Sequence, residues 1–375
     1  MRIPFLNIHA AYVELQPQIN AAFERVAQSG SYVLGSEVEA FEAEFADYCG
    51  ASHAVGVASG LDALHLSMRA LGIGPGDEVI VPSNAYIATW LSITRAGARP
   101  VPVEPNAATY NIDVDLIEAA ITSRTKAIVA LHLYGQPADL DPILGIAKRH
   151  GLYVVEDAAQ AHGATYRERR IGAHGHVVAW SFYPSKNLGA MGDAGAVTTD
   201  DPTLAEKIRI LRNYGSKVRY LNEVCGFNSR LDPMQAAILR AKLHKLNEWN
   251  ARRAAHASTY LRLLQGENQF VLPRVLECCA PAWHIFAVRH HKRDELRSAL
   301  LEHGIETLIH YPVPPHRQDA YRGEWEAGSF PIASMLADEV LSLPIGPHMT
   351  NDAVETVCSV LKSVTKSLHS PVLEK

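Results

Sequence analysis

Apolar runs and amphipathic segments alternate along the chain from about residue 37 to residue 213. Runs rich in Val, Ile and Ala predict buried strands at about 54–58, 78–81, 100–103, 127–133, 152–156, 177–182 and 195–199. Apolar residues at helical spacing predict helices at about 37–48, 61–71, 86–96, 113–121, 139–150 and 203–213. This alternation predicts an α/β fold with a mostly parallel central sheet sandwiched by helices.

The rest of the chain follows a different pattern. A long helical pattern opens near Asp232 and continues to about Leu264, which predicts a helix that bridges two domains. After it come a strand-like segment at 283–289, a helix at 293–303, an apolar segment at 305–309 and a last helix at about 351–368. We therefore predict a large α/β domain over residues 1–245 and a smaller C-terminal α+β domain over residues 246–375.

Composition narrows the class of protein. The 375 residues are 47% hydrophobic and 20% charged, which is enough chain for a large core. The net charge of -5 gives no long-range attraction to nucleic acid, and no apolar run is long enough to span a bilayer. The cysteines are odd in number and lack C-x-x-C spacing, and the N-terminus lacks a basic-plus-apolar signal. We expect a cytoplasmic protein without disulfides, and neither a nucleic acid nor a membrane as partner.

One lysine and one aspartate stand out as candidate chemistry. Lys186 follows the apolar segment at 177–182 and precedes a glycine-containing loop, and Asp157 ends the apolar run that begins at Val154. A lysine can bind pyridoxal phosphate as a Schiff base and move the substrate proton, while an aspartate beside the pyridine nitrogen keeps the ring cationic. The alternatives are a surface lysine and a helix-capping aspartate. The two residues together, in this order, predict a pyridoxal phosphate site.

A third feature is the small-residue strand that turns at Gly60 into the helix predicted at 61–71. The first turn of a helix has unpaired amides and a favourable dipole for an anion, so this turn is a candidate phosphate cradle. Close packing of small residues is the alternative.

Two other patterns predict no ligand site. The glycines at 72–76 precede a strand and are interrupted by Pro75, which indicates a turn instead of a dinucleotide site. Five further histidines lack the helical H-E-x-x-H spacing, so no metal is predicted: His162, His174, His176, His290 and His291.

An ordered set of motifs extends through nearly the whole chain: residues 29–35, 72–83, 156–160, 226–231 and 309–312. With these motifs the chain resembles the DegT-type sugar-nucleotide aminotransferases, within the fold-type I pyridoxal phosphate enzymes. Residues 181–190 and 84–90 look most like the group that aminates dTDP-linked 3-keto-6-deoxyhexoses at carbon 3. The chain departs from the commoner pattern at Leu61 and Ala85, which lack a frequent threonine hydroxyl, and at Ala194.

The resemblance implies a role for each of several residues. Lys186 would bind the cofactor and carry catalysis, Asp157 would pair with the ring nitrogen, and Gln160 would bind the phenolic oxygen. Tyr86 would stack on the ring. The phosphate would be held by Ser181, by the amides of Gly60 and Leu61, and by Asn228 of a neighbouring subunit, which implies a homodimer with shared sites. The substrate would contact Tyr183, His310 and Tyr311.

Each of these roles has a structural alternative. Tyr86 could be a core aromatic, Gln160 a loop amide, and Asn228 a cap for the helix that opens at Asp232. His310 and Tyr311 could simply pack beside the neighbouring prolines. Three local cations could bind an anionic substrate, or they could instead form a solvated basic face: Lys217, Arg219 and Arg230.

The predicted reaction is ping-pong transamination, with glutamate as amino donor and a nucleotide-linked keto-sugar as acceptor. The resemblance implies a dTDP-3-amino-3,6-dideoxyhexose as product. Many carbon-4 sugar aminotransferases carry a histidine where this chain has Tyr183, yet a carbon-4 aminotransferase stays the nearest alternative. A sugar dehydratase of this fold would replace Lys186 by histidine. A non-catalytic regulator on the same fold would have no reason to keep Lys186, Asp157 and Gln160 together.

Overall fold

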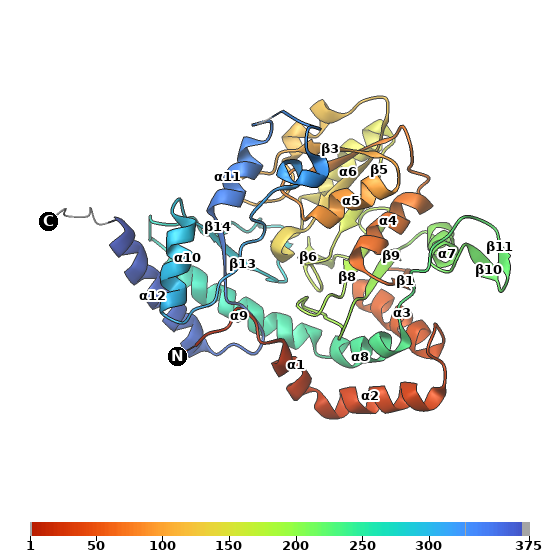
Figure 1. Ribbon diagram of the computed structural model, residues 1–375, viewed down its shortest axis with the longest axis horizontal. Coiled ribbons are helices and arrows are strands. Elements are labelled where there is room, and N and C mark those ends of the chain that lie inside the picture. The colour runs from red at the N-terminus through yellow and green to blue at the C-terminus, as the bar shows by residue number, and fades with distance from the viewer. Residues whose placement is uncertain (1, 327, 370–375) are drawn as a thin grey trace.

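A sheet of seven strands forms the centre of the computed structural model, which describes residues 2–326 and 328–369 (Figure 1). The strand order is β1-β9-β8-β5-β4-β2-β3. Strand β9 is antiparallel to both of its neighbours, and the other neighbouring pairs are parallel, as predicted. The strands are β1 (His53–Val57), β2 (Glu78–Pro82), β3 (Arg99–Val103), β4 (Thr125–Leu131), β5 (Tyr153–Asp157), β8 (Val177–Ser181) and β9 (Gly195–Thr199).

Helices cover both faces of this sheet, and the alternation of strand side chains shows why. Val154 belongs to a core with Phe41 and Ile143, from α3 (Ser36–Cys49) and α6 (Leu140–His150). Its neighbour Val155 belongs to the opposite core, with residues of three helices: α4 (Gly60–Ala70), α5 (Ile87–Arg95) and α7 (Pro202–Leu211). Because successive residues of a strand point to opposite faces, one apolar run supplies both cores. The predicted sandwich is confirmed.

Two helix predictions were wrong. Residues 113–121 form two short 3₁₀ turns, η1 (Val114–Leu116) and η2 (Glu118–Ala120), because the Asp113 side chain accepts the N–H of Asp115 and tightens the turn. The long helix is divided into α8 (Pro233–Leu243) and α9 (Leu246–Leu264). Between them the N–H of Lys245 bonds to the oxygen of Lys242 at 2.9 Å, so the helical hydrogen-bond ladder is interrupted.

The C-terminal part has the expected mixed α+β character. Strands β13 (Phe286–Arg289) and β14 (Val340–Leu343) pair antiparallel, and a separate core joins them to α9, α10 (Arg293–Glu302) and α12 (Asn351–His369). Residues 305–309 contribute isolated bridges, one of them to Ile3 near the start of the chain. Ile3 is buried in this C-terminal core. The domain boundary at 245/246 coincides with the turn between α8 and α9 and stays a prediction.

The sequence pattern did not predict several elements. These are α1 (Ile8–Glu14), α2 (Gln16–Ser29), α11 (Pro331–Glu339) and β14, together with short strands β6 (Thr165–Tyr166), β7 (Arg169–Arg170), β12 (Cys279–Ala280), β10 (Ser216–Val218) and β11 (Leu221–Asn222). Strands β10 and β11 form a hairpin that projects from the body beside α7 (Figure 1). Within the described residues no helix has the length and apolar character to cross a membrane.

Candidate active site

A cavity of about 490 Å³ opens where β5 and β8 end and α4 begins. This edge of a mostly parallel sheet is where α/β folds place ligands. Segments far apart in sequence meet here, including the residues around Tyr86 and around His310. The predicted site residues that line it are Gly60, Leu61, Tyr86, Asp157, Gln160, Ser181, Tyr183, Lys186, His310 and Tyr311.

Lys186 lies just beyond β8, on a turn in which its N–H donates to the oxygen of Tyr183 at 2.8 Å. Burial lowers the pKa of the Lys186 amine from 10.5 to about 8, and the negative charge of Asp157 opposes this shift. A larger fraction of the amine is therefore neutral near neutral pH than in an ordinary lysine. A neutral amine is the form that attacks a carbonyl carbon.

Asp157 is the last residue of β5, and its carboxylate is held from two sides. The hydroxyl of Thr89 donates to Oδ2 at 2.8 Å, and the N–H of Ala159 donates to Oδ1 at 3.2 Å. Burial raises the pKa of the Asp157 carboxyl, while the Thr89 hydrogen bond and the charge of Lys186 act against that rise. The carboxylate is thus fixed in orientation and interacts electrostatically with Lys186, which lines the same cavity.

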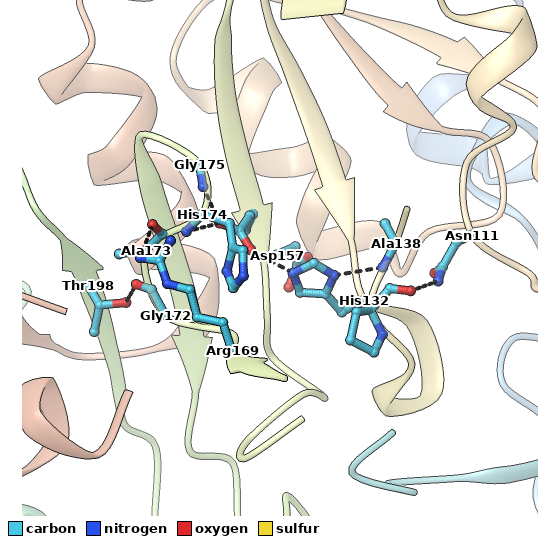
Figure 2. Close-up of polar contacts among 12 residues, drawn as sticks. Asn111, His132, Ala138, Asp157, Arg169, Gly172, Ala173, His174, Gly175 and Thr198 are labelled. Atoms are coloured by element: carbon cyan, nitrogen blue, oxygen red, sulfur yellow. Dashed lines mark hydrogen bonds and ion pairs between the residues drawn. The ribbon is translucent and has the colours of Figure 1, made fainter. Parts of the chain in front are cut away.

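Glu156, the preceding residue, points to the other face of the sheet. Its carboxylate contacts His132 Nε2 at 3.0 Å and accepts the N–H of Gly175 at 2.5 Å. Figure 2 shows His132 between Ala138 and the strand that ends in Asp157. Burial raises the pKa of the Glu156 carboxyl, but the hydrogen bonds from His132 and Gly175 outweigh burial and hold that pKa below its ordinary value. Glu156 therefore anchors the end of β5 on the face of the sheet away from the cavity, and Asp157 faces the cavity.

Gly60 begins α4 and lies against the end of β8. The side chain of Ser59 accepts the N–H of Asp62 at 3.1 Å. The amides of Gly60 and Leu61, which both line the cavity, have no acceptor within the helix because they belong to its first turn. A Cβ atom at Gly60 would lie 2.5 Å from the Cβ of Ser181. Glycine is therefore required for this close approach, and the helix N-terminus favours an anion there.

The amide of Gln160 is oriented by its neighbours. Its Oε1 accepts the N–H of Tyr134 at 2.5 Å, so its NH₂ group must be the one that donates to the Tyr311 hydroxyl at 3.0 Å. Tyr134 has a φ of 61°, in the left-handed region, which turns its N–H toward Gln160. The second hydrogen of the NH₂ group is left as a donor for an oxygen in the cavity.

Tyr86 and Tyr311 form one aromatic wall of the cavity, with ring centroids 4.9 Å apart. Tyr86 is 51% exposed, so the alternative of a core aromatic is wrong. Tyr183 is 55% exposed at the mouth. The His310 Nδ1 lies 2.8 Å from the Ser342 hydroxyl, and burial lowers the pKa of His310 to about 4, so its imidazole is neutral.

Lys217, Arg219 and Asn228 do not line this cavity within one chain. Lys217 lies on the projecting hairpin and pairs with Glu206 at 2.7 Å. The Arg219 guanidinium lies 4.9 Å from the Tyr220 ring centroid. Asn228 is exposed, and the N-cap of α8 is Asp232, so Asn228 does not cap that helix. The sequence order alone gave no means of separating these three residues from the others.

Two other features carry no predicted chemistry. A cleft of about 590 Å³ at the opposite edge of the sheet is lined by Glu78 and Arg124, which pair with each other at 2.6 Å. Among the described residues no group of three or more His, Cys, Asp or Glu side chains could hold a metal ion.

Residues that the sequence did not suggest complete the site. Thr89 holds Asp157, Tyr134 holds Gln160, and His284 lines the cavity near Lys186. Thr89 gave a weak signal, since it is a polar residue among the apolar residues of the first turn of α5. His284 and Tyr134 gave none, because each depends on a loop that approaches the site from a distant part of the chain.

The fold and the placement of Lys186 beside Asp157 define the class of fold-type I aminotransferases. The chain belongs to the DegT/DnrJ/EryC1/StrS aminotransferase family, which it matches over residues 13–362. The family predicted from the sequence motifs is confirmed.

Relatives named as sugar-nucleotide transaminases match this chain almost end to end. The dTDP-3-amino-3,4,6-trideoxy-alpha-D-glucose transaminase of Streptomyces venezuelae is 58% identical over 349 residues, covering 93% of this chain and 92% of that protein. The dTDP-3-amino-3,6-dideoxy-alpha-D-galactopyranose transaminase of Aneurinibacillus thermoaerophilus is 53% identical over 356 residues, covering 95% and 97%. The crystal structure of S. venezuelae DesV in complex with ketimine intermediate has a TM-score of 0.96 and 56% identity, covering 97% of this chain and 99% of that one.

Proposed function

We propose that this chain is a pyridoxal phosphate-dependent transaminase that aminates carbon 3 of a dTDP-linked 3-keto-6-deoxyhexose, with glutamate as donor. The observation that carries the chemistry is the meeting of Lys186, Asp157 and the α4 N-terminus in one cavity. The sugar and the carbon rest on the two relatives named for dTDP-3-amino sugars, at 58% and 53% identity.

The residues present fit the cofactor. The free amides at Gly60 and Leu61 match a phosphate, the oriented NH₂ of Gln160 matches a phenolic oxygen, and Asp157 matches a protonated ring nitrogen. When bound, pyridoxal phosphate supplies an electron sink that stabilises negative charge on the carbon from which a proton leaves.

Four side chains would act on the cofactor and the substrate. The Lys186 amine, partly neutral because of burial, would bond to the cofactor aldehyde carbon and, once displaced, would move the proton of the substrate carbon. Asp157, held by Thr89, would keep a proton on the ring nitrogen. Neutral His310 and the Tyr183 hydroxyl would orient the sugar through hydrogen bonds, without adding a charge near the cation of Lys186.

A second copy of the chain would complete the site. The hairpin that carries Lys217 and Arg219 exposes Tyr220 at 82% and Leu221 at 62%, and Asn228 follows it in sequence. Large exposed apolar side chains on a projecting hairpin are typical of a surface that a partner covers. We propose a homodimer in which this segment reaches the partner's cavity, so that Asn228 binds the phosphate and the two cations meet the nucleotide.

The cysteines support a cytoplasmic location, since all five are free thiols. Cys278 and Cys279 are adjacent, and their sulfur atoms lie 3.8 Å apart without a bond. A reducing compartment would keep them in this state.

The test is incubation of the purified protein with glutamate and either a 3-keto or a 4-keto dTDP-6-deoxyhexose, followed by NMR of the product. Nitrogen on carbon 3 is expected. Nitrogen on carbon 4, or turnover of 4-keto sugars alone, would establish the carbon-4 alternative and leave the transaminase class intact. Absence of turnover on every keto-sugar, with no colour after addition of pyridoxal phosphate, would favour a regulator.

A further inference from the structure

A chain of side-chain amides fixes the ring of His284. The Asn250 NH₂ donates to the main-chain oxygen of His162 at 2.7 Å, so the Asn250 Oδ1 is the acceptor for the Asn187 NH₂ at 2.8 Å. The Asn187 NH₂ also donates to the main-chain oxygen of Ala282 at 2.7 Å. The Asn187 Oδ1 therefore faces His284 Nδ1, 3.1 Å away. Because an amide oxygen can only accept, Nδ1 of His284 carries the hydrogen.

The other ring nitrogen of His284 is left for the cavity. His284 lines the cavity together with Lys186, and Nε2 has no hydrogen-bond partner in the part of the chain that the structure describes and is not sealed off. Burial and the nearby charge of Lys186 hold the pKa of His284 well below its ordinary value, so the ring is neutral. A neutral ring with its hydrogen on Nδ1 presents a lone pair on Nε2.

Hydrogen bonds to the main chain on both sides of His284 hold this residue in place. The Arg253 guanidinium donates to the oxygens of Trp283 at 3.2 Å and of His284 at 3.3 Å. The N–H groups of Ala282 and Ile285, on either side, bond to the loop around residue 135 at 2.9 and 3.2 Å. Since Asn187 directly follows Lys186, one side-chain hydrogen bond couples the histidine to the turn that carries the lysine.

Burial and the charge of Lys186 also lower the pKa values of His162 and His310, but neither of these rings is positioned as His284 is. His162 does not line the cavity, and its ring lies 5.2 Å from Trp180 and 5.6 Å from Phe182. His310 lines the cavity, but its Nδ1 partner is the Ser342 hydroxyl, which can donate or accept. Of the three, His284 has its tautomer fixed by an atom that can only accept.

We propose that His284 is a positioning residue for Lys186. The structure shows no hydrogen bond between the two side chains, so the Lys186 side chain has to rotate for one N–H of its free amine to reach Nε2. This hydrogen bond then directs the amine lone pair at the carbon whose proton is moved. The inference rests on the role proposed above for Lys186. No bond is made or broken at His284, so the residue is required for the rate of proton transfer and not for attachment of the cofactor.

A matched pair of substitutions separates this role from a structural one. The amide of an asparagine sits near the position of Nδ1, so His284→Asn can still bond to Asn187 but cannot reach the amine. The longer His284→Gln places its amide near the position of Nε2. In single-turnover reactions with glutamate, we expect His284→Asn to be about 100-fold slower and His284→Gln to stay within about fivefold of the parent. The isotope effect with α-deuterated glutamate should rise in His284→Asn.

The cofactor-free protein gives an independent readout. In ¹⁵N NMR the His284 ring should carry its hydrogen on Nδ1. The pKa of Lys186, measured by pH-dependent acetylation and mass spectrometry, should fall in His284→Asn and be retained in His284→Gln, because an acceptor for the ammonium is lost in the first alone. Asp157, His162 and His310, the other titratable groups that interact with Lys186, are the same in every variant. Exposed His303, substituted in the same two ways, is the control.

Three results would overturn the inference. If His284→Gln is slow and His284→Asn is not, the histidine only holds Asn187. If the glutamate reaction is unchanged and only the sugar reaction slows, His284 binds the sugar. If borohydride fixes the cofactor of the parent protein to a lysine other than Lys186, the proposed function of Lys186 fails first, and that result is distinguishable from the other two because it involves no His284 variant.

Discussion

Gly60→Ala should weaken cofactor binding while leaving the protein folded. The added methyl carbon would lie 2.5 Å from the Cβ and 3.1 Å from the Cα of Ser181. Both positions are fixed by the main chain of β8, so no side-chain rotation relieves the overlap. Alanine fits the helical backbone at this position, since Gly60 does not have a positive φ. The overlap can therefore be relieved only if the first turn of α4 moves away from the end of β8.

The expected size of the effect follows from that overlap. Overpacking of this kind costs about 1–3 kcal/mol, and relief requires α4 to move away from Ser181, which opens the candidate phosphate cradle. If the strain is carried by the cradle, the dissociation constant for pyridoxal phosphate should rise roughly 5- to 150-fold, at about 1.4 kcal/mol per factor of ten.

The assay is titration of the cofactor-free protein with pyridoxal phosphate, followed by absorbance, together with thermal unfolding. Gly145→Ala is the matched control: Gly145 lies within α6, and its new methyl would meet Arg149 Nη1 at 3.7 Å, an ordinary contact. That control should keep its affinity and gain up to about 1 kcal/mol of stability. Unchanged affinity in Gly60→Ala would refute the placement of the phosphate at this helix.

Four further outcomes follow from the site. Asp157→Ala should reduce turnover far more than cofactor content, because ring protonation matters most as charge develops in the transition state; equal losses of both, measured by kinetics and absorbance, would argue against this role. Thr89→Val should slow turnover by about tenfold, since Asp157 loses a charge-assisted hydrogen bond, and a rate equal to the parent would show that the bond is dispensable. Attachment of pyridoxal phosphate to the cofactor-free protein should accelerate as the pH rises through about 8, where the Lys186 ammonium loses its proton; a midpoint near 10.5 would show that burial does not lower its pKa. Mixed assemblies of Lys186→Ala and Asn228→Ala chains should regain part of the activity, and a fully active monomer would exclude a shared site.

The central sheet could be predicted from sequence because its strands are buried on both faces. Each is a short apolar run between helices of regular spacing, and the seven observed strands start within two residues of the predicted positions. The elements at 8–29 and 331–343 were missed because they lie outside that alternation. The helix predicted at 113–121 failed because a local side-chain bond of Asp113 outweighed an apolar pattern.

The candidate site divides in the same way. Lys186, Asp157 and Gly60 were found because each follows a recognisable strand or strand-to-helix turn, and such positions meet at one edge of a parallel sheet. Thr89, Tyr134 and His284 enter the site through tertiary hydrogen bonds, to Asp157, Gln160 and Asn187 respectively, and no spacing in the sequence encodes such contacts. Asn228, Lys217 and Arg219 do not line the cavity of one chain, and the second subunit that would bring them to a site is a proposal.

Reduction with borohydride tests the central claim most directly. The protein saturated with pyridoxal phosphate should lose its colour on reduction, and peptide mapping should place one stable adduct on Lys186 within the segment Ser181–Ala190. Lys186→Ala, treated in the same way, should give no adduct in that segment. An adduct on another lysine, or none on Lys186 when the bound cofactor is fully reduced, would contradict the account of this site.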